Sequence, residues 1–413
     1  MDEVGPSPEP EPIGRIFREE YGRSVATLIR IFGDIDLAED AVQEAFAVAL
    51  RKWPSEGFPP NPGGWITVTA RKRAIDRLRR EGRGQELFRE LAAVSPPNEH
   101  PEKHDDVGSF EDDRLRLIFT CCHPALSAEA RVALTLRLLG GLSTVEVARS
   151  FLVAEATMAQ RLVRAKRKIK AARIPYRVPA DAELPERLGA VLAVLYLLYN
   201  AGLSRSVQPD LCAEAIRLAR ILASLMPQQP EVAGLLALLL LTESRRASRT
   251  RPDGSLVLLG EQDRTRWDRG LRDEGLAIVR QCLLRDQPGP YQLQAAINAV
   301  HAKAASFEQT DWSEIVTLYD RLLAVAPTPI VALNRAIAVG EVAGPAAALA
   351  LVNELDLDNY YPFHATRADL LERLGRSREA DAAYQRAAAL APTGAERDFL
   401  MRGGRARRWR EAT

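Results

Sequence analysis

Two strongly basic stretches with helical apolar spacing constrain this chain more than any other feature. One covers residues 70–80 and the other covers residues 160–170. Residues 71–83 hold seven Lys/Arg and two acids, residues 161–173 hold seven and none, and residues 84–113 hold nine acids and two bases. This segregation of charge predicts two separate helical modules that each contact nucleic acid, with an acidic linker setting the reach between them.

The overall composition hides this pattern. The 413 residues carry a net charge of only +1, with 46% hydrophobic and 27% charged residues, as in soluble globular protein. Four cysteines are too few for a disulfide scaffold, and the N-terminus lacks the apolar core of a signal peptide. The longest apolar runs, near residues 188–199 and 232–241, fall short of the roughly 18 residues of a membrane span. We therefore expect a cytoplasmic protein whose apolar runs are buried helices.

Helical periodicity along the chain predicts an all-α fold in several segments. The only candidate strand is residues 251–259, where Pro-Asp-Gly predicts a turn. The expected segments are a disordered N-terminus, a first helical module, an acidic flexible linker, a second helical module and a C-terminal helical domain, at residues 1–12, 13–83, 84–113, 114–174 and 181–403.

The C-terminal domain repeats weakly. Small, aromatic and proline positions follow the spacing of the second helix of a tetratricopeptide unit, at Ala380, Tyr384, Ala387 and Pro392. Part of this spacing recurs 65 residues earlier, with an intermediate copy halfway, so the interval is 32 to 33 residues. A single helical pair cannot bury its apolar face alone, and the repeat therefore predicts an α-solenoid of stacked helical pairs.

In the first module, Asp36 to Glu39 has the spacing of a capping box and predicts a helix that runs to about Trp53. One apolar stripe is expected on this helix, at Val42, Phe46, Ala49 and Trp53. Its other face is acidic and polar, at Asp40, Gln43 and Glu44. By itself that face is as well explained by solvated surface as by a binding site.

A stiff Pro/Gly-rich loop, residues 58–65, leads into the first basic helix at residues 66–80. Val68, Ile75 and Leu78 are expected to pack inward. Trp65 is either a core residue or a support for an unpaired base. The basic residues expected to reach nucleic acid are Arg71, Lys72, Arg73, Arg77 and Arg80.

The second module has helix-turn-helix spacing. A capping box from Ser143 to Glu146 opens a short helix to Phe151, residues 152–154 form a turn, and a second helix runs from Glu155 to about residue 172. The inward stripe of that second helix is expected at Met158, Leu162, Ala165 and Ile169. The residues expected to face a major groove or its phosphates are Glu155, Thr157, Gln160, Arg161, Arg164, Lys166, Lys168 and Lys170. A merely solvated basic helix is the weaker alternative.

These residues resemble the sigma-70 family of RNA polymerase initiation factors, in particular the extracytoplasmic-function type. Residues 36–46, Trp53, Trp65 and residues 75–80 are similar to that family's domain 2, whereas residues 142–148, Thr157 and residues 161–168 are similar to its domain 4. The remainder resembles a subgroup with a tetratricopeptide-like extension, at residues 196–202, 262–267 and 289–297.

The resemblance implies a role for each face. Asp40, Gln43 and Glu44 would dock on the β′ subunit of core RNA polymerase. Trp65 and the basic helix after it would engage the −10 element, and the second module would contact the β subunit flap and read the −35 element of promoter DNA. The C-terminal domain would regulate these modules or recruit a further protein. At the start of the recognition helix the family's usual Ser or Thr cap is replaced by Ala154.

Two other functions fit parts of the pattern. One is a helix-turn-helix regulator that binds duplex DNA without core polymerase, and the other is a tetratricopeptide scaffold. Neither an enzyme nor a cofactor is indicated, because no nucleophile, P-loop or Gly-rich phosphate signature occurs. Cys121, Cys122 and His123 are adjacent and cannot build a tetrahedral metal site on one helix. Core packing is the main expectation for them, and redox sensing is the alternative.

Overall fold

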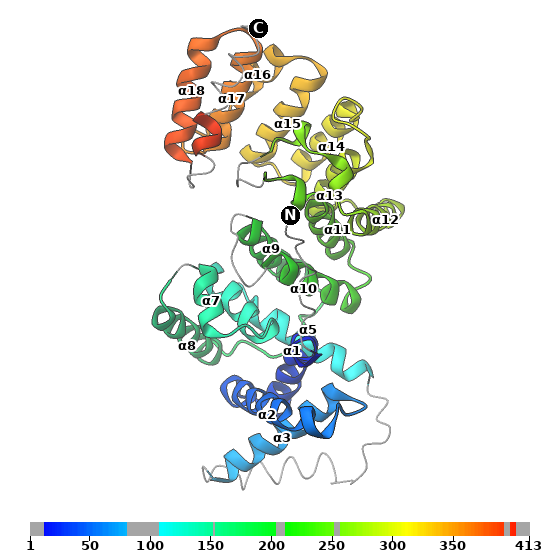
Figure 1. Cartoon of the computed structure of the whole chain (residues 1–413), viewed down its shortest axis with the longest axis vertical. Helices are drawn as coiled ribbons and strands as arrows, with labels where there is room; N and C mark the ends of the chain where they lie inside the picture. Colours follow the sequence, from blue (N-terminus) through cyan, green and yellow to red (C-terminus); the bar gives the residue numbers. More distant parts are fainter. Residues whose placement is uncertain are drawn as a thin grey trace, which may run out of the picture. The chain divides into compact units, whose positions relative to one another are not determined.

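The structure, a computed structural model, describes residues 12–80, 107–151, 153–203, 211–251, 257–391 and 397–401. The regular structure of these residues is helical, which confirms the prediction of an all-α fold (Figure 1). None of the described residues forms a β-strand. Residues 252–256 of the candidate strand lie outside the described residues, and beside them the Val257 N–H donates a hydrogen bond of 2.9 Å to the Arg249 carbonyl. The predicted disordered N-terminus and most of the acidic linker lie outside the described residues.

The chain divides into two compact units, residues 1–225 and 226–413. The first unit begins with three mutually packed helices, which form the first module: α1 (Pro12–Phe32), α2 (Ile35–Glu56) and α3 (Pro62–Arg80). The predicted stripe on α2 is buried, since Val42, Phe46, Ala49 and Trp53 are all at most 3% exposed. The apolar period of 3.6 residues therefore located this core correctly.

Three local predictions in the first module are wrong, and one of them is the start of α3, which lies at Pro62 rather than at residue 66. Helix α2 begins one residue before Asp36, because Asp34 is the N-cap and accepts a hydrogen bond of 3.0 Å from the Leu37 N–H. On α3, Val68 is 55% exposed rather than packed inward, and the buried stripe is formed by Ile66, Ala70 and Ala74. Small residues on this face let α3 approach its neighbours closely.

The second module follows in the same unit. Its first helix begins at Val107, earlier than the predicted end of the linker at residue 113. Thr135 to Leu139 form a short π-helical turn, labelled η1. The elements of the module are α5 (Val107–Cys121), α6 (Ala128–Leu134), η1 (Thr135–Leu139), α7 (Thr144–Phe151) and α8 (Glu155–Ala171).

Two further helices complete the first unit, α9 (Leu184–Leu203) and α10 (Leu211–Leu225). Helix α9 packs against α5, α6 and α10. Among the described residues it alone has the length and composition of a membrane span, and 44% of its apolar window is buried. Its packing against neighbouring helices accounts for that composition, as expected for a core helix.

The second unit is a chain of helices in which each packs against the next (Figure 1). Proline occupies the first turn of α11, α13, α15, α16 and α17, where its missing N–H costs nothing. This sequential stacking is that of an α-solenoid, as predicted. The helices are α11 (Pro230–Ser244), α12 (Arg269–Arg285), α13 (Pro290–Lys303), α14 (Trp312–Val325), α15 (Pro329–Val342), α16 (Pro345–Asn353), α17 (Tyr361–Arg373) and α18 (Ser377–Leu390).

The repeat positions that the sequence singled out have the expected burial. Ala380 and Ala387 on α18 are fully buried, and Leu322 on α14 is 2% exposed. Gly375 turns the chain between α17 and α18 with a φ of 73°, a conformation that favours glycine. Pro392 lies outside the described residues.

Candidate nucleic-acid interface

The helix-turn-helix forms as the sequence predicts. The Ser143 N–H donates to Oε2 of Glu146 at 2.7 Å, and the Glu146 N–H donates to Oγ of Ser143 at 3.2 Å. These reciprocal bonds are a capping box, and they satisfy two backbone donors at the start of α7. Helix α8 then begins at Glu155, with Ala154 as an N-cap that makes no side-chain bond. As the sequence indicated, an alanine stands at the N-cap of α8, and its side chain cannot cap the helix.

Helix α8 presents two distinct faces. Its predicted inward stripe is buried, since Met158, Leu162, Ala165 and Ile169 are at most 7% exposed. Arg161 is half-buried at the edge of this stripe. The residues predicted to face a groove or its phosphates that the structure leaves exposed are Glu155, Thr157, Gln160, Arg164, Lys168 and Lys170.

A cavity of about 370 Å³ lies beside α8, against the start of α6. Arg161, Arg164 and Lys168 line one side of it, and Ser127 and Glu129 line the other. Three cations along one side of the hollow favour an anionic ligand, and a DNA phosphate carries such a charge. Three of the residues predicted to bind the −35 duplex are therefore brought together.

Lys166 does not lie where the sequence placed it. Its Nζ is 2.7 Å from Oδ1 of Asp36 and 2.8 Å from Oε2 of Glu39, both on helix α2 of the first module. Only 16% of the Lys166 side chain is exposed. The pKa of this amine is raised: burial lowers it, but the carboxylates of Glu39 and Asp36 outweigh burial. In this arrangement Lys166 is engaged by carboxylates and is withdrawn from phosphates.

The basic residues of helix α3 also fall into an exposed group and a group held by other residues. Lys72, Arg73 and Arg80 are exposed, whereas Arg71 is half-buried. Nη1 of Arg77 is 2.6 Å from Oδ2 of Asp40 on α2. A residue predicted to bind the −10 element is therefore paired with a residue predicted to bind polymerase. The pair is about half exposed, so it contributes little to stability but does fix both side chains.

Trp65 belongs to an aromatic cluster. It sits in the first turn of α3, half-buried, and its ring is 5.4 Å from that of Trp53 in an edge-on arrangement of 63°. The ring of Phe58, which is 48% exposed, is also 5.4 Å from Trp53. Trp65 is thus supported by the core and partly open to solvent, which suits both roles that the sequence allowed.

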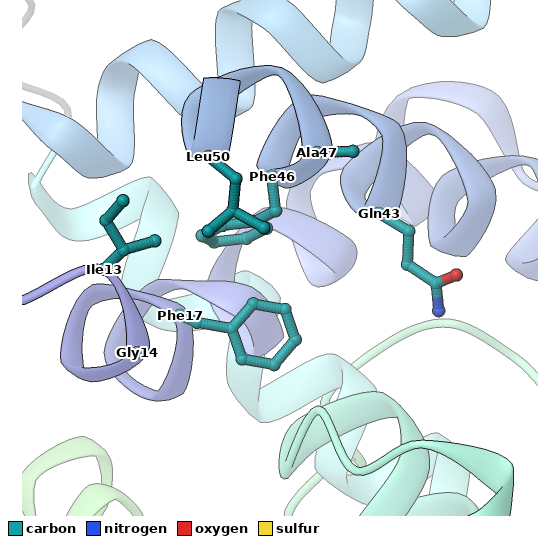
Figure 2. Close-up of a pocket in the computed structure, with 7 residues that line it drawn as sticks. All are labelled: Ile13, Gly14, Phe17, Gln43, Phe46, Ala47 and Leu50. Carbon is teal, nitrogen blue, oxygen red and sulfur yellow. The ribbon is translucent and has the colours of Figure 1, made fainter. Parts of the chain in front are cut away.

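An apolar groove runs between the start of α1 and the middle of α2. Figure 2 shows Phe17 of α1 facing Phe46 and Leu50 of α2, with Gln43 at one end. The Phe17 and Phe46 rings meet edge-on at 4.7 Å, and Leu50 is 56% exposed. Gln43 and Glu44, two of the three predicted polymerase contacts, are exposed on the same helix. The predicted polar face therefore borders an exposed apolar surface, which is typical of an interaction site.

The two cysteines of the Cys-Cys-His sequence are part of the core, whereas His123 is half-buried. Cys121 and Cys122 are buried, and burial raises the pKa of both thiols, that of Cys122 to about 11. Cys122 lies 3.6 Å from Oγ1 of Thr135. Among the described residues no cluster of His, Cys, Asp and Glu has the geometry to hold a metal ion. The main expectation for these cysteines, core packing, is confirmed.

Sequence reasoning missed the residues that join the two modules. Glu39 was read only as part of a cap, yet it is 5% exposed and pairs with both Arg137 and Lys166. Arg30 of α1 pairs with the fully buried Asp113 of α5 at 2.8 Å. These partners are far apart in the sequence, and no local periodicity signals them.

Two small helical modules, one with a helix-turn-helix and both with a basic helix, define a DNA-binding protein built for two contacts. Comparison with known families makes this specific. The family described as Sigma-70 region 2 matches residues 16–84, and Sigma-70 region 4 matches residues 116–169. The chain belongs to the sigma-70 family, of the extracytoplasmic-function type, and is a factor for promoter-specific transcription initiation. A family of unknown function, DUF6596, matches residues 187–283.

Two of the following relatives are sigma factors. Uncharacterized protein R00370 of Rhizobium meliloti is 44% identical over 387 residues, which cover 92% of each chain. The probable ECF RNA polymerase sigma factor SigI of Mycobacterium tuberculosis is 28% identical over 165 residues, or 40% of this chain and 56% of SigI. SigL of the same species is 31% identical over 38% of this chain and 87% of its own. The P58(IPK) tetratricopeptide domain aligns with 90% of this chain and 99% of its own at 11% identity, with a TM-score of 0.25.

Proposed function

We propose that the first module binds the β′ subunit of core polymerase through helix α2. The exposed Gln43 and Glu44 would supply polar contacts, and the groove between Phe17 and Leu50 would take an apolar side chain of the partner. Interfaces of this kind combine an apolar centre with a polar rim. Asp40 has a different part in this proposal, because its carboxylate is paired with Arg77 of α3.

Helix α3 and the Trp65 region would engage the −10 element. Lys72, Arg73 and Arg80 are exposed for phosphates, and Trp65 is placed to support an unpaired base. The second module would contact the β subunit flap and read the −35 duplex through α8. The observation that carries this part is the cavity beside α8, in which Arg161, Arg164 and Lys168 converge.

The second unit would act as a docking platform or regulator for the sigma modules. A solenoid supplies an extended surface for a peptide or another domain, and its sequential stacking supports that use. This role and a cytoplasmic location are in keeping with the family, whose members work on core polymerase and promoter DNA.

The test is transcription in vitro with purified core polymerase and a library of genomic fragments. We expect defined start sites that core polymerase alone does not produce, each with a shared upstream sequence. Duplex binding by the chain alone, with no transcription when core is added, would instead favour a regulator that acts from outside polymerase.

The polymerase contact is tested separately by Glu44→Lys. We expect this change to weaken core binding by about tenfold, or roughly 1.4 kcal/mol, because it places a cation where a carboxylate meets the partner. Glu56→Lys is the matched control, since Glu56 is an exposed acid at the end of the same helix. Equal core affinity for both variants would remove Glu44 from the interface.

A further inference from the structure

The second unit contains a segment that belongs to no helical pair of the solenoid. Between α11 and α12 the chain forms two single 3-10 turns, Leu259–Glu261 and Arg264–Arg266. We call residues 258–268 the strap. Its last N–H, that of Asp268, donates to the Ser244 carbonyl at 2.7 Å. The strap therefore ends against the last residue of α11.

One arginine of the strap joins it to the end of α13. Nη1 of Arg264 donates to the carbonyl oxygens of His301 and Ala304, at 2.7 Å and 2.6 Å. Its guanidinium carbon lies 5.1 Å from the centre of the Trp267 ring. The His301 ring in turn meets the ring of Trp312, the first residue of α14, edge-on at 5.2 Å. Polar and aromatic side chains of the strap, α13 and α14 are thus gathered around Arg264.

Four polar side-chain atoms in this region are shielded from solvent, and no residue that the structure describes bonds to any of them. They are Nη2 of Arg264, Nε1 of Trp267, Nδ1 of His301 and Oε1 of Gln262. Trp267 is only 5% exposed, so bulk water does not reach its indole N–H. Buried polar groups in native proteins nearly always have a hydrogen-bond partner. Four such atoms in one region therefore indicate a partner from outside the chain.

The charge of this region favours an anion. Burial lowers the pKa of Arg264, and the acid that opposes this shift, Glu308, is exposed. A desolvated guanidinium is tolerated only when an anion faces it. Burial, followed by the nearby Arg245 and Arg264, lowers the pKa of His301 to about 4. The imidazole is therefore neutral near pH 7 and can donate one N–H.

A carboxylate fits these groups better than a phosphate does. The guanidinium, indole and imidazole N–H groups supply three donors, and the single charge of Arg264 balances a single negative charge. A phosphate group carries up to about two negative charges at pH 7 and needs further cations. The amide oxygen of Gln262 can accept a hydrogen bond from a hydroxyl group on the ligand. Because all four atoms are covered, the ligand must be small enough to be enclosed.

We propose that the strap and the ends of α13 and α14 enclose a binding site for a small organic carboxylate. The carboxylate accepts hydrogen bonds from Arg264, Trp267 and His301. The strap admits the ligand by lifting, because it consists of single turns rather than a packed helix. All of these residues belong to the second unit, so the proposal goes beyond the function of the sigma modules and does not depend on it.

The test is calorimetric titration of the full chain with acetate, lactate and benzoate. Acetamide, lactamide and benzamide are the controls, because they have nearly the same shape without the charge. Arg264→Gln removes the guanidinium, and Trp267→Phe removes the indole N–H but keeps an aromatic ring. Arg266→Gln is the matched control variant, since Arg266 lies in the same turn and is exposed. A capped peptide with one glutamate probes the alternative of a protein partner.

We expect at least one of the acids to bind and its amide not to bind. Arg264→Gln should weaken that binding by about tenfold or more, because a charge-assisted hydrogen bond is lost, and Trp267→Phe should weaken it less. Arg266→Gln should bind as the unchanged chain does. Circular dichroism checks that each variant is folded. Trp267→Phe also leaves the bonds of Arg264 to α13 in place, so a loss of affinity there cannot come from a detached strap.

Three results would overturn the proposal. Equal affinity for an acid and its amide, or an affinity that Arg264→Gln leaves unchanged, would show that no carboxylate is recognised at this place. Binding of the glutamate peptide without binding of any small acid would replace the enclosed site with a docking surface for a protein. A crystal structure grown with benzoate and lactate that shows only water molecules on the four atoms would assign them to buried water.

Discussion

At the scale of single residues, charge is used in two ways on the same helices. On α8, Arg164 and Lys168 stay exposed beside the cavity next to α6, whereas Lys166 is paired with carboxylates. On α3, Lys72 and Arg73 are exposed, whereas Arg77 is paired with Asp40. The cations that remain exposed are the ones able to contact DNA before any rearrangement.

Arg161 and Lys168 should differ in how they affect DNA binding. A bidentate Arg–guanine contact is worth about 1–3 kcal/mol of discrimination, so Arg161→Ala should change the base preference of the −35 contact. Lys168→Ala should lower affinity for all sequences about equally and reduce its salt dependence by roughly one ion. Binding of holoenzyme to a randomised −35 library at two salt concentrations checks both. Identical losses across sequences would exclude base reading by Arg161.

His301 should make the second unit sensitive to acid. Burial, followed by the nearby Arg245 and Arg264, lowers the pKa of this imidazole to about 4. An unfolded His titrates near 6.5, so between about pH 6.5 and 4 the unfolded chain binds a proton that the folded chain does not. Stability should therefore fall as the pH drops through this window, by up to roughly 3 kcal/mol. His301→Gln should flatten that slope in urea melts at several pH values, and an unchanged slope would point to other groups.

At the scale of elements, the start of α2 is fixed by one side chain. Asp34 accepts a hydrogen bond from the Leu37 N–H, whereas Asp36, two residues further along, makes no capping bond and is mostly exposed. Asp34→Ala should therefore cost about 1 kcal/mol of stability. Asp36→Ala is the comparison and should cost less, because an exposed ion pair contributes little. Thermal unfolding of the two variants measures the difference, and a larger loss for Asp36→Ala would contradict the cap.

Much of the fold could be predicted from local patterns. The buried stripes of α2 and α8 follow from a period of 3.6 residues, and the cap of α7 follows from the spacing of Ser143 and Glu146. The prediction that Val68 packs inward was wrong because an apolar side chain does not by itself show which face of the helix is buried. On α3 the inward face is made of small residues such as Ala70 and Ala74, whose burial hydropathy signals only weakly.

The candidate site was predictable only in part. The identity of the basic and acidic faces came from the sequence, but the engagement of Lys166 by Glu39 did not. Their contact spans 127 positions in the chain and depends on how α1 packs on η1, through Gly22 and the backbone of Leu139. An ion pair between residues far apart in the chain produces no periodic pattern in the sequence. A lysine that is paired with a carboxylate cannot be told from the sequence apart from a lysine that is free to contact DNA.

At the scale of the whole molecule, the first unit extends beyond the two sigma modules. Helices α9 and α10 pack on α5, and Arg187 and Arg217 donate hydrogen bonds to the carbonyls of Phe119 and Leu139, at 2.8 Å and 3.1 Å. A chain that ends at Leu225 keeps these contacts, and one that ends at Arg173 loses them. The family match of DUF6596, at residues 187–283, covers most of α9 and all of α10.

Truncation at the two positions should therefore give different proteins. The chain ending at Leu225 should unfold cooperatively, whereas the chain ending at Arg173 should be markedly less stable, because the apolar surface of α5 and α6 is exposed. Chemical unfolding checks this, and equal midpoints would show that α9 and α10 are dispensable. Transcription by the Leu225 chain, compared with the full chain, then reports what the second unit contributes.

The contact between Gly22 and the Leu139 carbonyl has a consequence for how such factors diversify. Only a hydrogen atom fits between these two backbones at Gly22. A methyl group at this position would therefore clash with the Leu139 carbonyl and force the two modules apart, although no charged residue is changed. A hybrid that combines the first module of one relative with the second module of another inherits two surfaces that have not been fitted to each other. The second module therefore cannot be exchanged freely between relatives. A change of promoter specificity is easier through substitutions on the exposed face of α8 than through replacement of the whole module.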